Sequence, residues 1–383
     1  MTPRLTSLAL ILLTAGCTAT GTSRPRHEAC TTVTPYAGPA LRTPVTDGVA
    51  QLRPRIRTGL NADERTALSA AFSRAQDATG APSMTVAVWQ EGGVPWSAHH
   101  GTPDGHLHYW ASVGKIVTAA AILRLEADGR MSLDDPIGTY LEGVPNGDII
   151  TLRMLMNHTS GLFSANEDRQ VRARGEPLDL ETTLDVVRRQ PPYACPGGAW
   201  RYSNSGYTLL GAVIEKMTGR PYHAAAYDLV LARSAGRAIR LIAPEETLEG
   251  IVQPAGVSAE PRLDLRGPQA AGGAVADAQS MALFLRDLMA GRILPRETVT
   301  RMLTDLYPMS QDGVWYGLGL MVYDVPGPDG TSVWIGHSGG APGARAVLAY
   351  APAQDAIVAV ALTGDGSAEA TANLLLDALE RDH

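Results

Sequence analysis

The sequence predicts a protein of the α/β (α+β) class, with an antiparallel five-stranded sheet flanked by helices and an inserted all-helical lobe. Strand-like segments gather near both ends of the 383-residue chain, whereas residues 131–261 consist mostly of helical segments and loops. Short turns join the last three strand-like segments, which suits an antiparallel meander. If the early strands pair with the late ones, the middle of the chain becomes the inserted lobe. The expected divisions are 1–16, 17–55, 56–130, 131–261 and 262–383.

Composition excludes several classes of protein. Hydrophobic residues make up 45% of the chain, which is enough to bury a core and argues against disorder. The formal net charge of −7 argues against nucleic acid as a partner. Three cysteines are too few for a disulfide scaffold or a cysteine-rich zinc module.

Residues 1–16 are predicted to form an export signal. Arg4 precedes the apolar run Leu5–Leu13, and the small residues Thr14–Gly16 stand directly before Cys17. This arrangement resembles a bacterial lipoprotein signal. The resemblance implies that Cys17 is lipidated and that the protein is exported and anchored to a membrane of the cell envelope. An ordinary cleaved signal followed by an incidental cysteine is the alternative.

Residues 17–55 are predicted to tether the folded body to the membrane. They are rich in Thr, Pro, Ser, Gly and Arg and have no helical or strand period. Export would place Cys30 and Cys195 in an oxidising compartment, where they are able to form a disulfide. Two free thiols are the alternative, because sequence alone does not fix the geometry that a disulfide needs.

The first predicted elements of the body are a capped helix and a hairpin. Asn61 is the expected N-cap of a helix that runs to Thr79, and Met84–Gln90 and Val94–His100 flank a Glu-Gly-Gly turn. The next helix, Ser112–Ala127, has few polar positions and is expected to be buried. Further helices are expected at Thr151–Asn157, Leu180–Arg189, Tyr207–Thr218, Tyr222–Ala232, Ala276–Met289 and Ala368–Leu379, and further strands at Tyr316–Tyr323, Ser332–Ile335, Ala344–Tyr350 and Ala356–Leu362.

The first cluster with catalytic potential is Ser112-Val113-Gly114-Lys115. Ser112 and Lys115 lie one helical turn apart on the same face, and a serine at a helix N-terminus lies where developing negative charge is stabilised. A buried lysine can lose its proton and act as a base, which arginine cannot do. Only two of the 32 basic residues are lysines, Lys115 and Lys216. The alternative is a helix cap followed by a surface lysine.

Two later clusters could complete such a site. Tyr202-Ser203-Asn204 follows the Pro/Gly loop Pro196–Trp200, and a phenol near a lysine can shuttle a proton. Gly336–Gly340 ends a predicted strand, where a backbone N–H can stabilise an oxyanion and glycines permit close approach of a substrate.

Together, the three clusters resemble the penicillin-recognising serine hydrolases, which include class C β-lactamases, D-alanyl-D-alanine carboxypeptidases, D-aminopeptidases and related esterases. The order Ser-x-x-Lys, Tyr-x-Asn and His/Lys-x-Gly matches that superfamily, with intervals of 90 and 135 residues. The stretches Asn157–Leu162, Ala271–Gly273 and Tyr316–Gly319 also resemble it. The resemblance covers residues 60–380 and implies a β-lactamase/transpeptidase-like fold.

The resemblance also implies catalytic roles. Ser112 would be the nucleophile that forms an acyl-enzyme, Lys115 would assist its deprotonation, and Tyr202 would shuttle protons. The division of work between Lys115 and Tyr202 remains open at this point. The substrate would be a small molecule or peptide with an acyl group, and no metal or organic cofactor is implied.

Substrate-binding roles follow in the same way. Asn204 would hold the substrate amide, His337 and Gly339 would line the strand edge, and the N–H groups of Ser112 and Gly340 would form the oxyanion hole. His337 stands where class C β-lactamases have lysine, which favours a peptidase or esterase over a true β-lactamase. A lipid-anchored penicillin-binding or sensor module with negligible turnover is a further alternative.

Three other interpretations stay open. Gly336–Gly340 also fits Gly-x-Ser-x-Gly, the nucleophile elbow of α/β-hydrolases, with Ser338 as the nucleophile. The charged stretch Asn166–Glu176 is expected to be a solvated loop, or else to lie at the rim of the cleft. The densest group of histidines is expected to lie on a hairpin and its following loop, and a metal site is the alternative. That group is His99, His100, His106 and His108.

Overall fold

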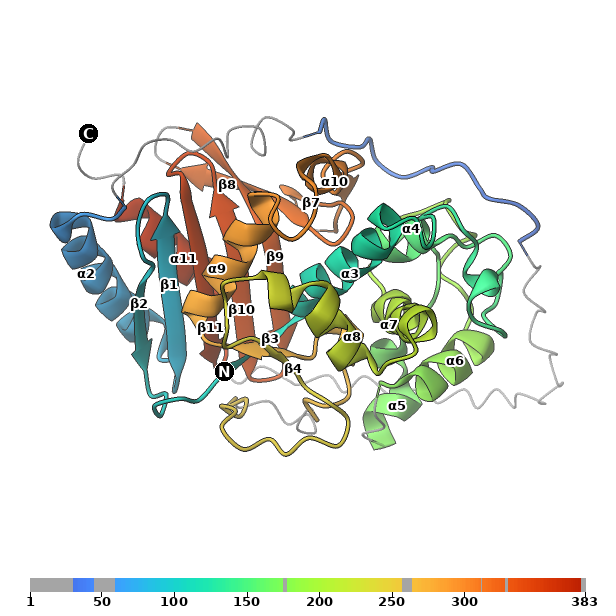
Figure 1. The fold of residues 1–383 in the computed structure, drawn as a ribbon, viewed down its shortest axis with the longest axis horizontal. Helices are drawn as coiled ribbons and strands as arrows, with labels where there is room; N and C mark the ends of the chain where they lie inside the picture. Colours follow the sequence, from blue (N-terminus) through green and yellow to red (C-terminus); the bar gives the residue numbers. More distant parts are fainter. Residues whose placement is uncertain are drawn as a thin grey trace, which may run out of the picture.

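The computed structural model of the protein describes residues 30–44, 59–174, 178–256, 264–310, 312–327 and 330–379. The predicted signal and Cys17 lie outside these residues, as do 17–29 and 45–55 of the predicted tether. In the described ranges, a sheet-based body lies beside a helical lobe (Figure 1). None of the helices in these ranges combines the length and apolar character needed to cross a membrane.

The body contains an antiparallel sheet of eight strands, in the order β2-β1-β11-β10-β9-β8-β7-β6. The early hairpin of β1 (Met84–Gln90) and β2 (Trp96–His100) pairs through β1 with β11 (Ala356–Thr363). Next come β10 (Ala344–Ala351) and β9 (Gly330–Ala341). The predicted pairing of the early hairpin with the late strands is therefore confirmed.

The predicted count of five strands is wrong because the far edge of the sheet is built from short pieces. The single strand predicted at Tyr316–Tyr323 spans the end of β7 (Val314–Tyr316), a turn, and the start of β8 (Met321–Gly327). The short strand β6 (Tyr307–Pro308) pairs with β7 and forms the edge of the sheet. Gly319 has a φ of +80° in the turn between β7 and β8. Strands of two and three residues are too short to show a period of two in sequence.

Helices cover both faces of this sheet. α2 (Ala62–Thr79) and α11 (Ala368–Asp377) lie on one face, and α9 (Ala278–Met289) lies on the other (Figure 1). Every residue of β11 is buried, because alternate side chains point into the two helix-covered cores. Asn61 caps α2 as predicted, and its side chain accepts a hydrogen bond from the Glu64 N–H.

The helical lobe packs around α3 (Lys115–Ala127). As predicted, almost all of this helix is buried. The other helices of the lobe are α4 (Leu152–Met156), α5 (Arg169–Arg174), α6 (Leu180–Arg189), α7 (Asn204–Thr218) and α8 (Tyr222–Leu229). The short helix α10 (Arg296–Arg301) lies beside the body.

A second sheet of three strands leads into α3. It has the order β3-β5-β4, with β3 at His108–Ala111, β5 at Ala274–Ala276 and β4 at Arg240–Leu241. The 3₁₀ turn η1 (Ser112–Gly114) connects β3 directly to α3 and contacts β9. The N-terminus of α3 therefore lies where the sheet body meets the helical lobe.

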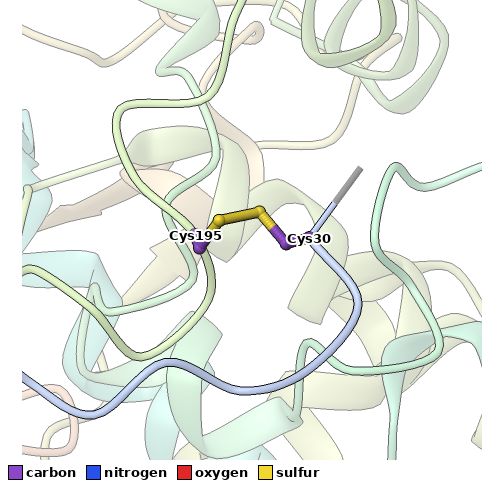
Figure 2. Close-up of a disulfide and its surroundings, with 2 residues drawn as sticks. All are labelled: Cys30 and Cys195. Carbon is purple, nitrogen blue, oxygen red and sulfur yellow. A yellow bond between two sulfur atoms is a disulfide. The ribbon is translucent and has the colours of Figure 1, made fainter. Parts of the chain in front are cut away.

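Residues 30–44, which we name the strap, lie against the body and correct part of the tether prediction. Cys30 and Cys195 form the predicted disulfide (Figure 2). The Thr34 N–H donates to the Pro196 carbonyl at 2.8 Å. A Cβ on Gly198 would lie only 3.2 Å from the Thr34 methyl group, so the loop before Tyr202 is shaped to receive the strap.

The other end of the strap reaches the far edge of the sheet. The Arg42 N–H donates to the Leu306 carbonyl at 3.0 Å, and its guanidinium lies over the Trp315 ring and pairs with Asp324. The strap thus connects the loop before Tyr202 to the β6–β8 edge. Backbone bonds hold much of this segment, which explains why its sequence shows no amphipathic period.

Candidate active site

Ser112 lies at the sharp change of direction between β3 and α3. Ala111, the last residue of β3, has a φ of +47°, a rare and strained conformation for a residue other than glycine. The Ser112 side chain is half-buried at the start of η1. Gly114 allows β5 to pack closely, since a Cβ there would lie 3.2 Å from the Ala274 Cβ.

Lys115 is fully buried and meets three oxygen atoms. Its Nζ lies 3.1 Å from Ser112 Oγ and 2.6 Å from Asn204 Oδ1, and it also contacts the Ala271 carbonyl oxygen. Burial lowers the pKa of Lys115 well below its usual 10.5. The lysine is therefore biased toward the neutral amine beside the serine hydroxyl.

Tyr202 places a buried phenol near Ser112 and Lys115. Its hydroxyl has no hydrogen-bond partner in the part of the chain that the structure describes. Lys115 Nζ lies 5.0 Å from the centre of its ring. Burial raises the pKa of Tyr202, while the Ser112 hydroxyl acts in the opposite direction. The phenol therefore keeps its proton at neutral pH.

Asn204, the first residue of α7, is held from both sides. Its Oδ1 accepts from Lys115, and its Nδ2 donates to Asn166 Oδ1 at 2.8 Å. Its backbone N–H donates to Ser164 Oγ at 2.9 Å, and Ser164 Oγ also donates to Asn166. Ser164 was not identified from sequence, although it lies two residues after the stretch that ends at Leu162. Asn166 begins the stretch Asn166–Glu176, for which a solvated loop and the rim of the cleft were the two expectations, and its contact with Asn204 favours the rim.

Gly339 brings β9 against the nucleophile turn. A Cβ at this position would overlap the Trp110 carbonyl oxygen and lie 3.1 Å from the Ser112 backbone nitrogen. Gly340 is exposed, and a Cβ there would meet only the Arg345 side chain, at 3.9 Å. The strand edge and the Ser112 N–H therefore lie together as predicted.

His337 is buried as a neutral imidazole. Its Nδ1 contacts the Ser338 carbonyl, which can only accept, so Nδ1 carries the proton and Nε2 accepts from the Tyr316 hydroxyl at 3.0 Å. Burial, and secondarily Lys115, lower the pKa of His337 to about 3. His337 thus lies behind the strand edge and carries no positive charge.

The α/β-hydrolase interpretation is wrong. A nucleophile elbow needs a strand, a sharp turn and a helix. Ser338 instead lies within β9, which continues to Ala341 and turns back into β10. Its Oγ contacts Met321 Sδ at 3.7 Å.

The histidine group does not converge. His99 and His100 are exposed on β2, whereas His108 is buried with its Nε2 2.9 Å from Ser83 Oγ. Within the described ranges, no three His, Cys, Asp or Glu side chains are placed to hold a metal ion.

Comparison with known proteins identifies the family. The chain matches the Beta-lactamase family over residues 68–381 and therefore belongs to it. The match and the fold together make the chain a serine hydrolase of this family.

Individual relatives show the range of the family. The chain is 37% identical over 114 residues to the putative penicillin-binding protein PbpX of Bacillus subtilis, covering 30% of this chain and 27% of that protein. It is 35% identical over 142 residues to esterase EstB of Burkholderia gladioli, covering 33% and 36%. These matches span about a quarter to a third of the curated relatives. A solved D-stereospecific amidohydrolase from Streptomyces is 28% identical, with a TM-score of 0.70, covering 84% of this chain and 99% of that one.

Proposed function

We propose that this protein hydrolyses esters or amides through an acyl-enzyme on Ser112. The observation that carries the proposal is the buried Lys115, whose Nζ lies 3.1 Å from Ser112 Oγ. Hydrolysis by serine needs a base within hydrogen-bond distance of the hydroxyl, with a pKa lowered toward neutrality.

The contacts of Lys115 suit the role of base. A neutral amine has two N–H bonds, and Asn204 Oδ1 and the Ala271 carbonyl are placed to accept them. The nitrogen lone pair is then free to accept the proton of Ser112. Ser112 Oγ attacks the acyl carbonyl as that proton moves to Lys115.

The remaining steps use the other side chains of the site. Negative charge on the tetrahedral intermediate would be stabilised by the N–H groups of Ser112 and Gly340. Tyr202 would give its proton to the leaving alcohol or amine and regain a proton from Lys115. In deacylation a water molecule attacks the ester, loses a proton to this pair, and Ser112 recovers its hydrogen.

The absence of positive charge at His337 on β9 supports the proposed choice of substrate class. A neutral His337 offers no ammonium group for the carboxylate of a β-lactam, which favours substrates that lack such a carboxylate. The similarity to a named esterase and to a named D-stereospecific amidohydrolase supports esters and D-amino-acid amides. We therefore propose the esterase or aminopeptidase activity ahead of the β-lactamase or carboxypeptidase activity.

We also propose that the protein is exported and anchored through a lipid on Cys17. The disulfide between Cys30 and Cys195 supports this location, because disulfides persist in oxidising compartments. Metabolic labelling with a fatty acid analogue tests it. Label on wild type but not on Cys17→Ala is expected, and equal label on both would refute the anchor.

The catalytic proposal is tested by intact mass after exposure to a fluorophosphonate. One adduct is expected on wild type and on Ser338→Ala, and none on Ser112→Ala. An adduct on Ser112→Ala would refute the proposal. Turnover of a p-nitrophenyl ester, a D-amino-acid p-nitroanilide and a chromogenic cephalosporin then separates the substrate classes. Labelling of Ser112 without turnover of any of them would favour the binding module.

A further inference from the structure

A buried histidine, His158, contacts the loop that contains Tyr202 at three points. The Arg201 N–H donates to the His158 carbonyl at 3.0 Å, and the Ser203 N–H donates to His158 Nδ1 at 3.2 Å. Between these two bonds, the rings of His158 and Tyr202 lie 4.2 Å apart, with 37° between their planes. His158 therefore contacts the backbone of both neighbours of Tyr202, Arg201 and Ser203, as well as the Tyr202 ring.

The conformation of His158 serves this arrangement. Its φ is +64°, in the left-handed region that residues other than glycine rarely occupy. Both its carbonyl and its imidazole accept hydrogen bonds from the same loop. His158 occupies this strained backbone conformation although Asn or Gly would adopt it more readily.

The chemistry of the ring is also defined. Because Nδ1 accepts a backbone N–H, the imidazole is neutral and carries its proton on Nε2. That Nε2 is buried and finds no hydrogen-bond partner among the described residues. The side chains facing the ring include Tyr207, Tyr316 and Trp200. Burial, Lys115 and His337 all keep the pKa of His158 low, which protects the acceptor at Nδ1.

We propose that His158 is the positioning residue for Tyr202. The inference rests on the proposed function, in which the Tyr202 phenol protonates the leaving group. Apart from the Ser112 hydroxyl, beside which it acts, the phenol oxygen has no partner among the described residues, so its place depends on the Tyr202 ring and backbone. His158 supplies contacts to both. An apolar aromatic residue would stack equally well but would leave the buried Ser203 N–H unsatisfied.

The test separates the two kinds of contact. His158→Phe keeps a ring and removes the acceptor, whereas His158→Asn keeps an acceptor and tolerates the left-handed backbone but removes the ring. The measurement is kcat/KM for two esters of one acid, an ethyl ester and a p-nitrophenyl ester. Only the ethyl ester has a leaving group that needs a proton.

We expect His158→Phe to lower kcat/KM for the ethyl ester by roughly 10- to 100-fold, the scale of a small misplacement of a catalytic group. The loss for the p-nitrophenyl ester should be at least tenfold smaller. In a Tyr202→Phe background, substitution of His158 should cause no further loss on the ethyl ester, because both changes remove the same proton transfer. If His158→Phe does not fold, the test uses His158→Asn. The criteria are the same: a larger loss on the ethyl ester than on the p-nitrophenyl ester, and no further loss in the Tyr202→Phe background.

The matched control is His108→Phe, which removes another buried histidine that bonds a side chain away from Tyr202. Its effect should be equal on both esters and should multiply with that of Tyr202→Phe. Equal losses on both esters for the His158 variants, or multiplication with Tyr202→Phe, would overturn the inference. These outcomes leave labelling of Ser112 intact, whereas failure of the proposed function appears as labelling of Ser112→Ala.

Discussion

Removal of the Cys30–Cys195 disulfide is expected to cost a large part of the stability of the protein. The two cysteines are 165 residues apart in sequence. A cross-link over a loop of that length lowers the entropy of the unfolded chain by an amount worth about 5 kcal/mol at 25 °C. Globular proteins are stable by only about 5–15 kcal/mol, so this contribution is a substantial fraction of the total.

The assay is urea unfolding of wild type and of the Cys30→Ser, Cys195→Ser double variant, with reduced wild type as the matched control. We expect the free energy of unfolding to fall by about 2–5 kcal/mol, and reduced wild type to match the double variant. A loss below about 1 kcal/mol would show that the strap stays ordered and that the cross-link constrains little.

The same variant also distinguishes two supports of the Tyr202 loop. The strap bonds to the loop at Pro196, whereas the contacts on either side of Tyr202 come from His158. The value of kcat/KM for the ethyl ester at 25 °C without urea should therefore stay near that of wild type. A loss on the ethyl ester from a folded double variant that still hydrolyses the p-nitrophenyl ester would show that the strap, and not His158, sets the position of Tyr202.

Three further predictions concern the strand edge and its neighbours. Gly339→Ala should destabilise the fold by about 1–3 kcal/mol and slow labelling, because its methyl group overlaps the backbone before Ser112, whereas Gly340→Ala should leave the melting temperature unchanged. Lys115→Arg should abolish turnover, as measured by ester hydrolysis, because a guanidinium cannot accept the proton; activity within tenfold of wild type would contradict this. The buried His337 has a pKa near 3, so the unfolded chain binds a proton there that the folded chain does not. The contribution of His337 to the free energy of unfolding should be fully present above about pH 6.5 and should be lost as the pH drops toward 3. His337→Phe should make this fall in stability shallower without abolishing it in urea-unfolding measurements at several pH values, because burial lowers the pKa of His108 and His158 as well. An unchanged slope would refute the assignment.

The sequence predicted the candidate site residues whose chemistry depends on type and spacing, and the structure places Ser112, Lys115 and Asn204 in contact. Ser112 and Lys115 are one helical turn apart, so their contact follows from helix geometry. Tyr202 and Asn204 flank the start of a helix, and the Pro/Gly loop before them indicated a fixed position. Short turns also predicted the antiparallel meander of the late strands, and pairing with the early hairpin was the simplest way to join the two ends of the chain.

Other parts of the site depend on tertiary contacts that no local pattern shows. His158 was visible only as part of the Asn157–Leu162 stretch, because nothing near it in sequence reveals that its partner lies at Tyr202. Asn166 lay in a stretch whose charge suggested solvent, with the rim of the cleft as the alternative. The strap was mistaken for part of a tether because backbone hydrogen bonds and a disulfide leave no hydrophobic period.

The electrostatics of the site explain why its basic groups are arranged as they are. Burial lowers the pKa values of Lys115, His158 and His337. The charge of a protonated Lys115 would lower the pKa values of the two histidines further. The contacts of both imidazoles also require the neutral form, since each has a nitrogen that accepts a hydrogen bond. Positive charge can therefore develop on Lys115 without opposition from a neighbouring cation. That charge develops when Lys115 takes the proton of Ser112, which is when negative charge grows on the acyl oxygen. The neutral histidines thus lower the cost of the proton transfer that the proposed mechanism requires.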